Sequence, residues 1–218
     1  LLAFMLGWLF GMAMNFFHGK DQMTETLSTA AEEGKKQIAI TFDDGPNPEY
    51  TMKLLEGLKK RGVKATFFVL GEEVERYPDI LKAAYDDGHL IGVHSYQHVN
   101  FGQIGDAAAL EQVEKTRQAI YDVTGEYTGY IRPPYGCWKK ELDQELPMIE
   151  VLWDIDPLDW ATKDADTVVQ RVLQKCPDGS IILLHDASES SVCAAFTIID
   201  TLQKQGYEFV TVEELMLE

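Results

Sequence analysis

The chain has 218 residues, of which 45% are hydrophobic and 25% are charged, and its formal net charge at pH 7 is −17. This length and composition predict one globular domain with a substantial core. The excess of acidic residues would repel phosphates and argues against a nucleic-acid partner, but it leaves a neutral sugar or peptide substrate open.

The chain starts with an uncharged apolar run, residues 1–17. A membrane span needs about 20 apolar residues, and this run is close to that length. Three interpretations are open: a membrane anchor, a secretory signal and a buried helix of the domain. Residues 11–13 are a poor cleavage site, which favours an uncleaved anchor. Residues 18–36 are polar and without apolar periodicity, as expected of a linker. We therefore predict a folded domain at residues 37–218, anchored to a membrane or, if the first segment is cleaved, secreted.

From residue 37 onward, short apolar runs alternate with segments of helical periodicity. Strands are predicted at Gln37–Phe42, Ala65–Leu70, Leu90–His94, Tyr130–Arg132, Ile149–Trp153, Ser180–Leu184 and Tyr207–Val210. Helices are predicted at Glu49–Arg61, Val74–Asp87, Asp106–Val123, Thr167–Gln174 and Ala194–Gln205, and four of them end at or just before a glycine. This alternation predicts a parallel sheet with helices outside, and seven strands favour an α/β barrel or a barrel-like closure.

Two adjacent carboxylates, Asp43 and Asp44, follow the first predicted strand and precede Gly45-Pro46. The same four residues also form a good turn, since Gly permits a positive φ and Pro fixes φ. The strand nevertheless delivers both acids to its carboxyl end, where α/β folds carry their chemistry. Two buried acids side by side need a positive partner. A metal ion held by one Asp and two His would provide it and leave the other Asp free as a base.

His94 and His98 are the candidate histidines for such a site. Their spacing of four would place both imidazoles on one face of a helical turn. Imidazole binds first-row divalent metals, and a carboxylate completes a three-ligand site with positions open to water or substrate. Two surface histidines are the alternative, because this spacing is common by chance. The preceding Asp43-Asp44 pair favours ligation.

Three more candidates lie where other predicted strands or turns end: Arg132, Asp159 and His185. Taken singly, they are explained by a structural salt bridge, a helix-capping acid and a hydrogen-bonded core histidine. In a parallel barrel, however, the carboxyl ends of the strands converge on one mouth. Their shared location therefore predicts one site, and the residue types in it indicate a metal-dependent hydrolase.

Five segments in this order, TFDDGP, HSYQH, RPPYG, DPLDW and ILLHD, resemble the motifs of the NodB-homology polysaccharide deacetylases, carbohydrate esterase family 4. The resemblance runs from about residue 35 to residue 218. Val99, where many relatives have Pro, and Cys137 depart from the usual pattern. The resemblance implies a distorted (β/α) barrel and a hydrolase that removes N-acetyl groups from amino sugars of peptidoglycan or chitin-type oligomers. The hydrophobic start resembles membrane-tethered members of Gram-positive bacteria, which act outside the cytoplasmic membrane.

The resemblance also implies a metal centre and its base. Asp44, His94 and His98 would hold a divalent metal, with zinc as the expected ion and cobalt, manganese or nickel as alternatives. Asp43 would be the general base, and Arg132 would pair with it and orient it.

The same resemblance implies an acid and a substrate pocket. His185 would be the general acid, held by Asp159. Trp160 and Leu183 would wall the pocket around the acetyl methyl group, and the backbone N–H of Tyr135 would help to stabilise the oxyanion.

Two other functions stay open at this stage: hydrolysis of acetyl esters on xylan-type glycans, and a catalytically silent module that binds cell wall. The sugar preference and the oligomeric state are not predicted. For Cys137, Cys176 and Cys193 free thiols are expected, with a Cys176–Cys193 bridge as the alternative for an exported domain.

Overall fold

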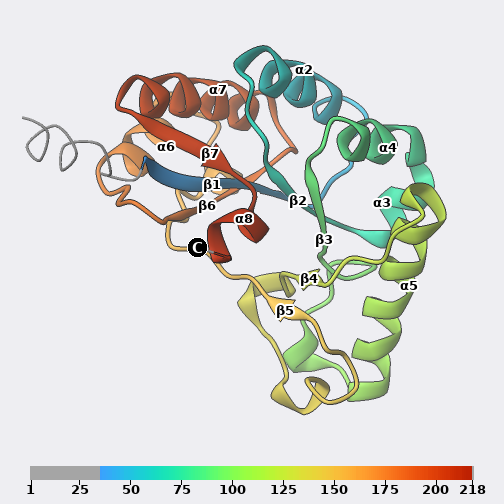
Figure 1. The fold of residues 1–218 in the computed structure, drawn as a ribbon. Coiled ribbons are helices and arrows are strands. Elements are labelled where there is room, and N and C mark those ends of the chain that lie inside the picture. The colour runs from blue at the N-terminus through green and yellow to red at the C-terminus, as the bar shows by residue number, and fades with distance from the viewer. Residues whose placement is uncertain (1–34, 218) are drawn as a thin grey trace, which may run out of the picture. The chain divides into compact units, whose positions relative to one another are not determined.

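Seven strands alternate with helices in the computed structural model, which describes residues 35–217 (Figure 1). The predicted anchor and most of the predicted linker lie outside these residues. The strands are β1 (Lys36–Asp43), β2 (Thr66–Val69), β3 (Leu90–Val93), β4 (Tyr130–Ile131), β5 (Ile149–Glu150), β6 (Ile181–His185) and β7 (Tyr207–Val210). The α-helices are α2 (Thr51–Arg61), α3 (Gly71–Arg76), α4 (Pro78–Asp86), α5 (Asp106–Thr124), α6 (Ala165–Leu173), α7 (Glu189–Lys204) and α8 (Val212–Met216).

All strand pairs are parallel, and the main sheet order is β5-β4-β3-β2-β1-β6. Strand β7 pairs with the amino half of β1, on the edge that β2 occupies farther along. Beyond β5, one isolated parallel bridge joins Ile155 to Ile182 of β6. The sheet is therefore curled and only loosely closed, which confirms the expected distorted (β/α) barrel.

Alternation along β1 explains how the sheet separates its two faces. Ile38, Ile40 and Phe42 lie in the main core, which the outer helices cover. Ala39 packs in a second, smaller cluster inside the curl, and the Thr41 and Asp43 side chains contact a buried arginine there. Because successive side chains of a strand point to opposite faces, one strand contributes both to the main core and to the interior of the curl.

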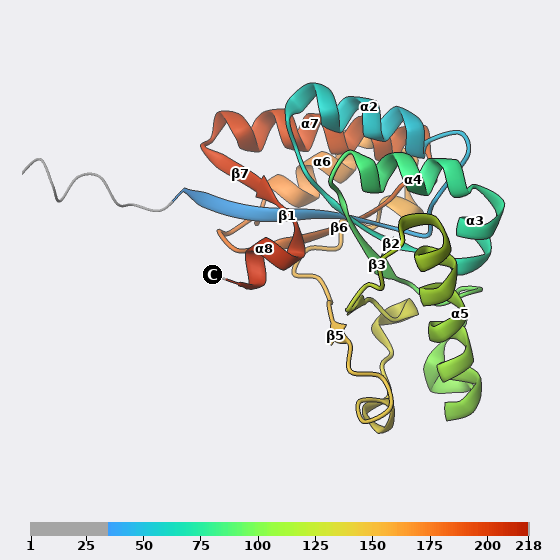
Figure 2. The same ribbon diagram turned by 45° about the vertical axis from the view of Figure 1, so that its right-hand side comes forward.

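Helices cover the outer face of the curled sheet in the packing order α6, α7, α2, α4, α5 (Figures 1 and 2). The short helix α8 packs inside the curl, where Val212 belongs to the apolar cluster that also contains Ala39, Phe68 and Val151. Between residues 35 and 217, no helix is both long and apolar enough to cross a membrane.

The helix predicted at Val74–Asp87 is wrong as a single element. The structure has α3 and α4 there, separated at Tyr77. Pro78 is the first residue of α4 and has no N–H to continue the preceding helix, whereas Pro is well tolerated in a first turn.

Other element ends also differ from the prediction by a few residues, and capping explains two differences near helix starts. Helix α7 begins at Glu189 rather than residue 194, because the Ser188 side chain accepts a hydrogen bond from the Ser191 N–H and caps it. Helix α8 was not predicted, although Thr211 and Glu214 form a reciprocal capping box at its start. The folded unit starts at Lys36, one residue before the expected boundary.

Candidate metal centre and active site

Asp43 and Asp44 lie at the carboxyl end of β1, as predicted, and they have different surroundings. Asp43 is buried, with 2% of its surface exposed, whereas a third of the Asp44 side chain is exposed. The Asp44 backbone has a φ of 77°, and its N–H donates to the Phe68 carbonyl at 3.2 Å. This left-handed turn sends the two neighbouring carboxylates in different directions.

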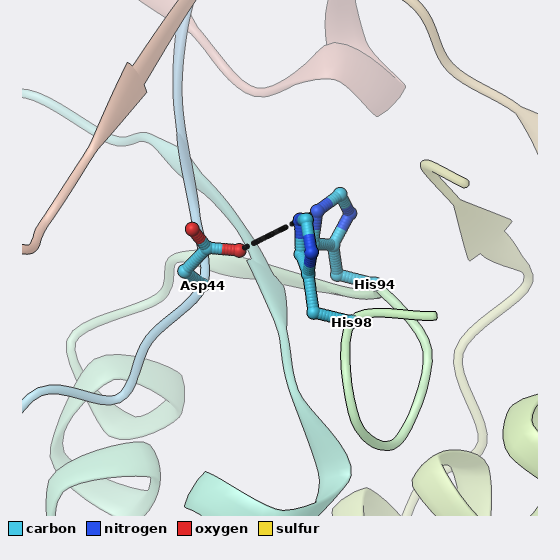
Figure 3. A group of neighbouring side chains, drawn as sticks. All are labelled: Asp44, His94 and His98. Atoms are coloured by element: carbon cyan, nitrogen blue, oxygen red, sulfur yellow. Dashed lines mark ion pairs between the residues drawn. The ribbon is translucent and has the colours of Figure 1, made fainter. Parts of the chain in front are cut away.

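The Asp44 carboxylate points toward the imidazoles of His94 and His98 (Figure 3). Its Oδ1 lies 3.5 Å from Nε2 of each histidine. Two ligands of a tetrahedral zinc ion, each at about 2.05 Å, are about 3.4 Å apart. Both Asp44–His distances are therefore close to the spacing of two zinc ligands, and the three ligand atoms all lie within 4.8 Å of one another.

Further features of these residues fit a divalent cation. Within the described residues, Asp44 Oδ1 is buried and has no hydrogen-bond partner. The His94 Nδ1 lies 2.6 Å from the carbonyl oxygen of Arg132, which fixes Nδ1 as the donor and leaves the Nε2 lone pair directed at Asp44. Burial lowers the pKa of His94, so the ring is neutral, as a metal ligand must be.

The segment between the two histidines is a loop, and the predicted helical turn is wrong. Ser95 and His98 both have positive φ values, 82° and 54°. The side chain of Gln112 in α5 accepts hydrogen bonds from the backbone N–H groups of Tyr96 and Gln97, at 3.1 and 2.9 Å. A contact from a distant helix thus brings the imidazoles together, which the spacing of four residues alone does not specify.

Arg132 is fully buried and holds Asp43 in place. Its Nη1 donates to Asp43 Oδ1 at 2.8 Å and to the Thr41 hydroxyl at 2.7 Å. Its Nε and Nη2 donate to the carbonyls of Val151 and Leu152, at 3.0 and 3.1 Å. With one oxygen occupied by Arg132, Asp43 keeps Oδ2 directed to the site, 3.8 Å from His94 Nε2.

His185 and Asp159 form the second charged pair. The His185 Nδ1 donates to Asp159 Oδ1 at 2.8 Å, and the His185 backbone N–H donates to Oδ2 at 2.9 Å. Burial alone would lower the pKa of His185, but the hydrogen bond and the charge of Asp159, helped by Asp43 and Asp44, raise it to about 9. Asp159 begins a short 3-10 turn rather than directly following a strand.

A cavity of about 440 Å³ connects these groups. Its lining consists of Asp43, Asp44, His94, His98, Tyr135, Trp153, Asp156, Trp160, Leu183 and His185. Tyr135 and Trp160 are exposed at 64% and 67%, while Leu183 is buried. Arg132 and Asp159 do not line the cavity, but Arg132 contacts Asp43 and Asp159 contacts His185. The structure therefore brings all ten predicted site residues into one region.

The sequence interpretation missed Trp153 and Asp156, which also line the cavity. Asp156 belongs to the DPLDW segment, and its Oδ1 accepts the Leu158 N–H at 2.8 Å. This bond holds Leu158 at a φ of 56° and sets the turn that presents Asp159 and Trp160. The position of Asp156 in a short turn was the available signal, and for Trp153 the signal was its location at the carboxyl end of the strand predicted at Ile149–Trp153.

Backbone strain gathers around this cavity. Among residues 35–217, the non-glycine residues with positive φ are Asp44, Ser95, His98, Tyr135 and Leu158. Each of them lies in a loop or short turn that carries residues lining the cavity. Such conformations cost about 1–3 kcal/mol each and persist where the surroundings enforce them, typically at functional sites.

The three cysteines are free thiols in the structure.

Comparisons with known proteins identify relatives of this chain in sequence and in fold. The sequence profile described as polysaccharide deacetylase matches residues 30–150. The chain is 41% identical over 195 residues to the peptidoglycan-N-acetylmuramic acid deacetylase PdaC of Bacillus subtilis, covering 88% of this chain and 42% of PdaC. It is 39% identical over 180 residues to the peptidoglycan-N-acetylglucosamine deacetylase PgdA of Listeria monocytogenes, covering 83% of this chain and 39% of PgdA.

The chain thus spans about two fifths of the length of these two curated relatives. The solved structure of PdaC from Bacillus subtilis superimposes with a TM-score of 0.82 at 41% identity. This match covers 85% of the present chain and 92% of the solved one.

Proposed function

The chain belongs to the polysaccharide deacetylase family, and on that premise we propose that it hydrolyses N-acetyl groups of amino sugars in peptidoglycan. The observation that carries the proposal is the pairing of Asp43 with Arg132 and of His185 with Asp159 around one cavity, beside Asp44, His94 and His98. The names of the two relatives support peptidoglycan as the polymer, and chitin-type oligomers are the alternative.

Asp44, His94 and His98 would hold a divalent ion, and zinc is the ion that this ligand set favours. When bound, such an ion polarises the acetamide carbonyl and lowers the pKa of water.

Asp43 is the general base in this proposal. Its Oδ2 accepts a proton from the water molecule as the water oxygen attacks the carbonyl carbon. Arg132 prevents rotation of the carboxylate, because hydrogen bonds to Thr41, Val151 and Leu152 fix the guanidinium itself. A base held in one orientation needs no reorganisation during the reaction.

His185 is the general acid. Its Nδ1 is bound to Asp159, so Nε2 is the nitrogen that donates a proton to the amine as the carbon–nitrogen bond breaks. The products are acetate and a free amino sugar. The backbone N–H of Tyr135 donates to the oxyanion, while Trp160 and Leu183 enclose the acetyl methyl group.

A catalytically silent module would be expected to lack the base, a metal ligand or the acid, and this chain retains all of them. Hydrolysis of acetyl esters on xylan needs the same groups and differs in the glycan that reaches them. The two relatives are named for different sugars, N-acetylmuramic acid and N-acetylglucosamine, so either sugar is a candidate acceptor.

We also propose that the domain acts on the outer side of a bacterial cytoplasmic membrane, with residues 1–17 as the anchor and residues 18–36 as the linker. The apolar composition of the first segment supports the anchor. Fractionation of cells that express the full chain tests it: the protein should stay with membranes in high salt and be released by detergent. Recovery of a processed protein in the medium would contradict the anchor.

Mass spectrometry of glycan products tests the reaction and the substrate together. Zinc-loaded protein is incubated with peptidoglycan fragments, chitooligosaccharides and acetylated xylan, and protein treated with a chelator is the control. Each acetyl group removed lowers the product mass by C2H2O, and fragmentation identifies the sugar that lost it. We expect this loss from peptidoglycan fragments. An unchanged mass for every acetylated glycan would contradict the proposed function.

A further inference from the structure

Asp186 is a buried acid that the proposed reaction does not use. It follows His185 directly, and only 1% of its surface is exposed. Its Oδ2 accepts a hydrogen bond from the Thr51 hydroxyl, and within the described residues its Oδ1 is buried without a partner. Burial raises the pKa of this carboxyl to about 7. Isolated buried acids are costly, so the location of this one calls for a reason.

Thr51 connects Asp186 to the turn that carries the metal ligand. Thr51 is the first residue of α2, and its hydroxyl oxygen also accepts the Asn47 backbone N–H at 2.7 Å. The Asn47 side chain accepts in turn from the N–H groups of Glu49 and Tyr50, at 2.9 and 3.1 Å. One hydroxyl group thus joins the end of β6 to the far end of the turn at residues 44–47.

The Asp186 carboxylate also lies directly against Gly45. A Cβ atom at position 45 would overlap both carboxylate oxygens, so no other residue fits there without displacing the acid. On its other side the turn is bound to the end of β2, because the Gly45 carbonyl accepts the Leu70 N–H at 3.0 Å. The turn is therefore clamped between β2 and Asp186.

This clamp explains how Asp44 keeps an unfavourable backbone conformation. At a φ of 77° a non-glycine residue is strained, and it relaxes unless its neighbours are fixed. Relaxation would swing the Asp44 carboxylate away from His94 and His98. We propose that Thr51 and Asp186 are positioning residues that hold Asp44 in its metal-binding orientation and tie that turn to the acid His185. This inference rests on the proposed role of Asp44 as a metal ligand.

Zinc affinity measured by titration calorimetry on the full chain tests the clamp without depending on activity. Thr51→Val keeps the shape of the side chain and removes both hydrogen bonds, so the zinc dissociation constant should rise about 10-fold or more, as is typical when groups that orient metal ligands are removed. Thr51→Ser retains the hydroxyl and should restore binding to within about threefold of wild type. Asp186→Asn keeps an acceptor for Thr51 and should also bind zinc nearly as wild type, while Asp186→Ala should weaken binding as Thr51→Val does.

The matched control is Thr197→Val on the exposed face of α7, whose hydroxyl donates to the Cys193 carbonyl within its own helix. It should leave zinc affinity unchanged. Melting temperatures of the metal-free variants separate positioning from general stability, since a purely structural role lowers the melting temperature without changing zinc affinity in the folded protein.

The outcomes also separate this inference from the proposed function. If wild type binds zinc and releases acetate, and folded Thr51→Val and Asp186→Ala proteins bind zinc equally well, the clamp is refuted and the function stands. If Thr51→Val does not fold, the zinc affinities of Asp186→Ala and Thr51→Ser decide: unchanged affinity in folded Asp186→Ala refutes the clamp. If wild type itself binds no zinc and releases no acetate, the proposed function fails first.

Discussion

Replacing Asp159 by Asn should remove the proton that the leaving amine needs. The present pair raises the pKa of His185 from its ordinary value of 6.5 to about 9. This shift corresponds to about 3 kcal/mol in favour of the imidazolium. In the variant the Asp159 carboxylate is gone and burial remains, so the pKa of His185 should fall well below about 9.

The assay is acetate release across pH 5 to 10. In wild type the rate declines on the basic side as His185 loses its proton, near its raised pKa. In Asp159→Asn this decline should begin at a clearly lower pH, and kcat at pH 8 should fall about 100-fold or more, as expected when a general acid is lost.

Stability gives a second readout with a defined sign. A histidine whose pKa is raised in the folded state stabilises the protein fully below pH 6.5, and that contribution is lost as pH rises through about 9. The variant should lose this pH dependence. Asp164→Asn, a surface helix cap, is the control and should keep the wild-type profile. An unchanged basic limb and kcat in Asp159→Asn would refute the acid–partner reasoning.

Trp160→Ala should raise KM about fivefold or more in steady-state kinetics, because the indole encloses the acetyl group. Its free energy of unfolding in urea should stay within about 0.5 kcal/mol of wild type, because Trp160 is 67% exposed. An unchanged KM would contradict a role of Trp160 in substrate binding. Arg132→Met leaves Asp43 buried without its partner and should lower unfolding free energy by about 3–5 kcal/mol in urea titrations; a loss under 1 kcal/mol would contradict the pairing. Burial lowers the pKa of His89 from 6.5 to about 4, so the free energy of unfolding should fall by up to about 3 kcal/mol as pH decreases from 6.5 to 4. Urea unfolding at several pH values should show a smaller decrease for His89→Asn. An equal decrease in both proteins would exclude His89 as its source.

Much of the fold was readable from the sequence because parallel strands in this protein are continuous apolar runs. The run at β1 is buried on both faces, and the strand positions predicted from such runs agree with the structure within a few residues. The short strands β4 and β5 were predicted at the right positions, but the predicted strands were longer than those in the structure. Local signals were sufficient where the core decides the structure.

Local signals failed where distant contacts decide the structure. The His94–His98 loop depends on Gln112 of α5, and nothing in its own five residues reveals this. The bond between Arg132 and Asp43 joins residues 89 positions apart, and that between Thr51 and Asp186 joins residues 135 apart. The family resemblance supplied the first partnership, whereas the second emerged only from the folded chain.

Zinc stoichiometry and acetate release, measured together on Asp43→Asn and Asp44→Asn, test the central claim that the two adjacent acids have unlike roles. Asp43→Asn should bind one zinc ion per chain while its turnover falls about 100-fold or more, because the base is lost and the ligands remain. Asp44→Asn should lose zinc and turnover together. Loss of zinc from both variants, or normal turnover in Asp43→Asn, would contradict this division of the pair.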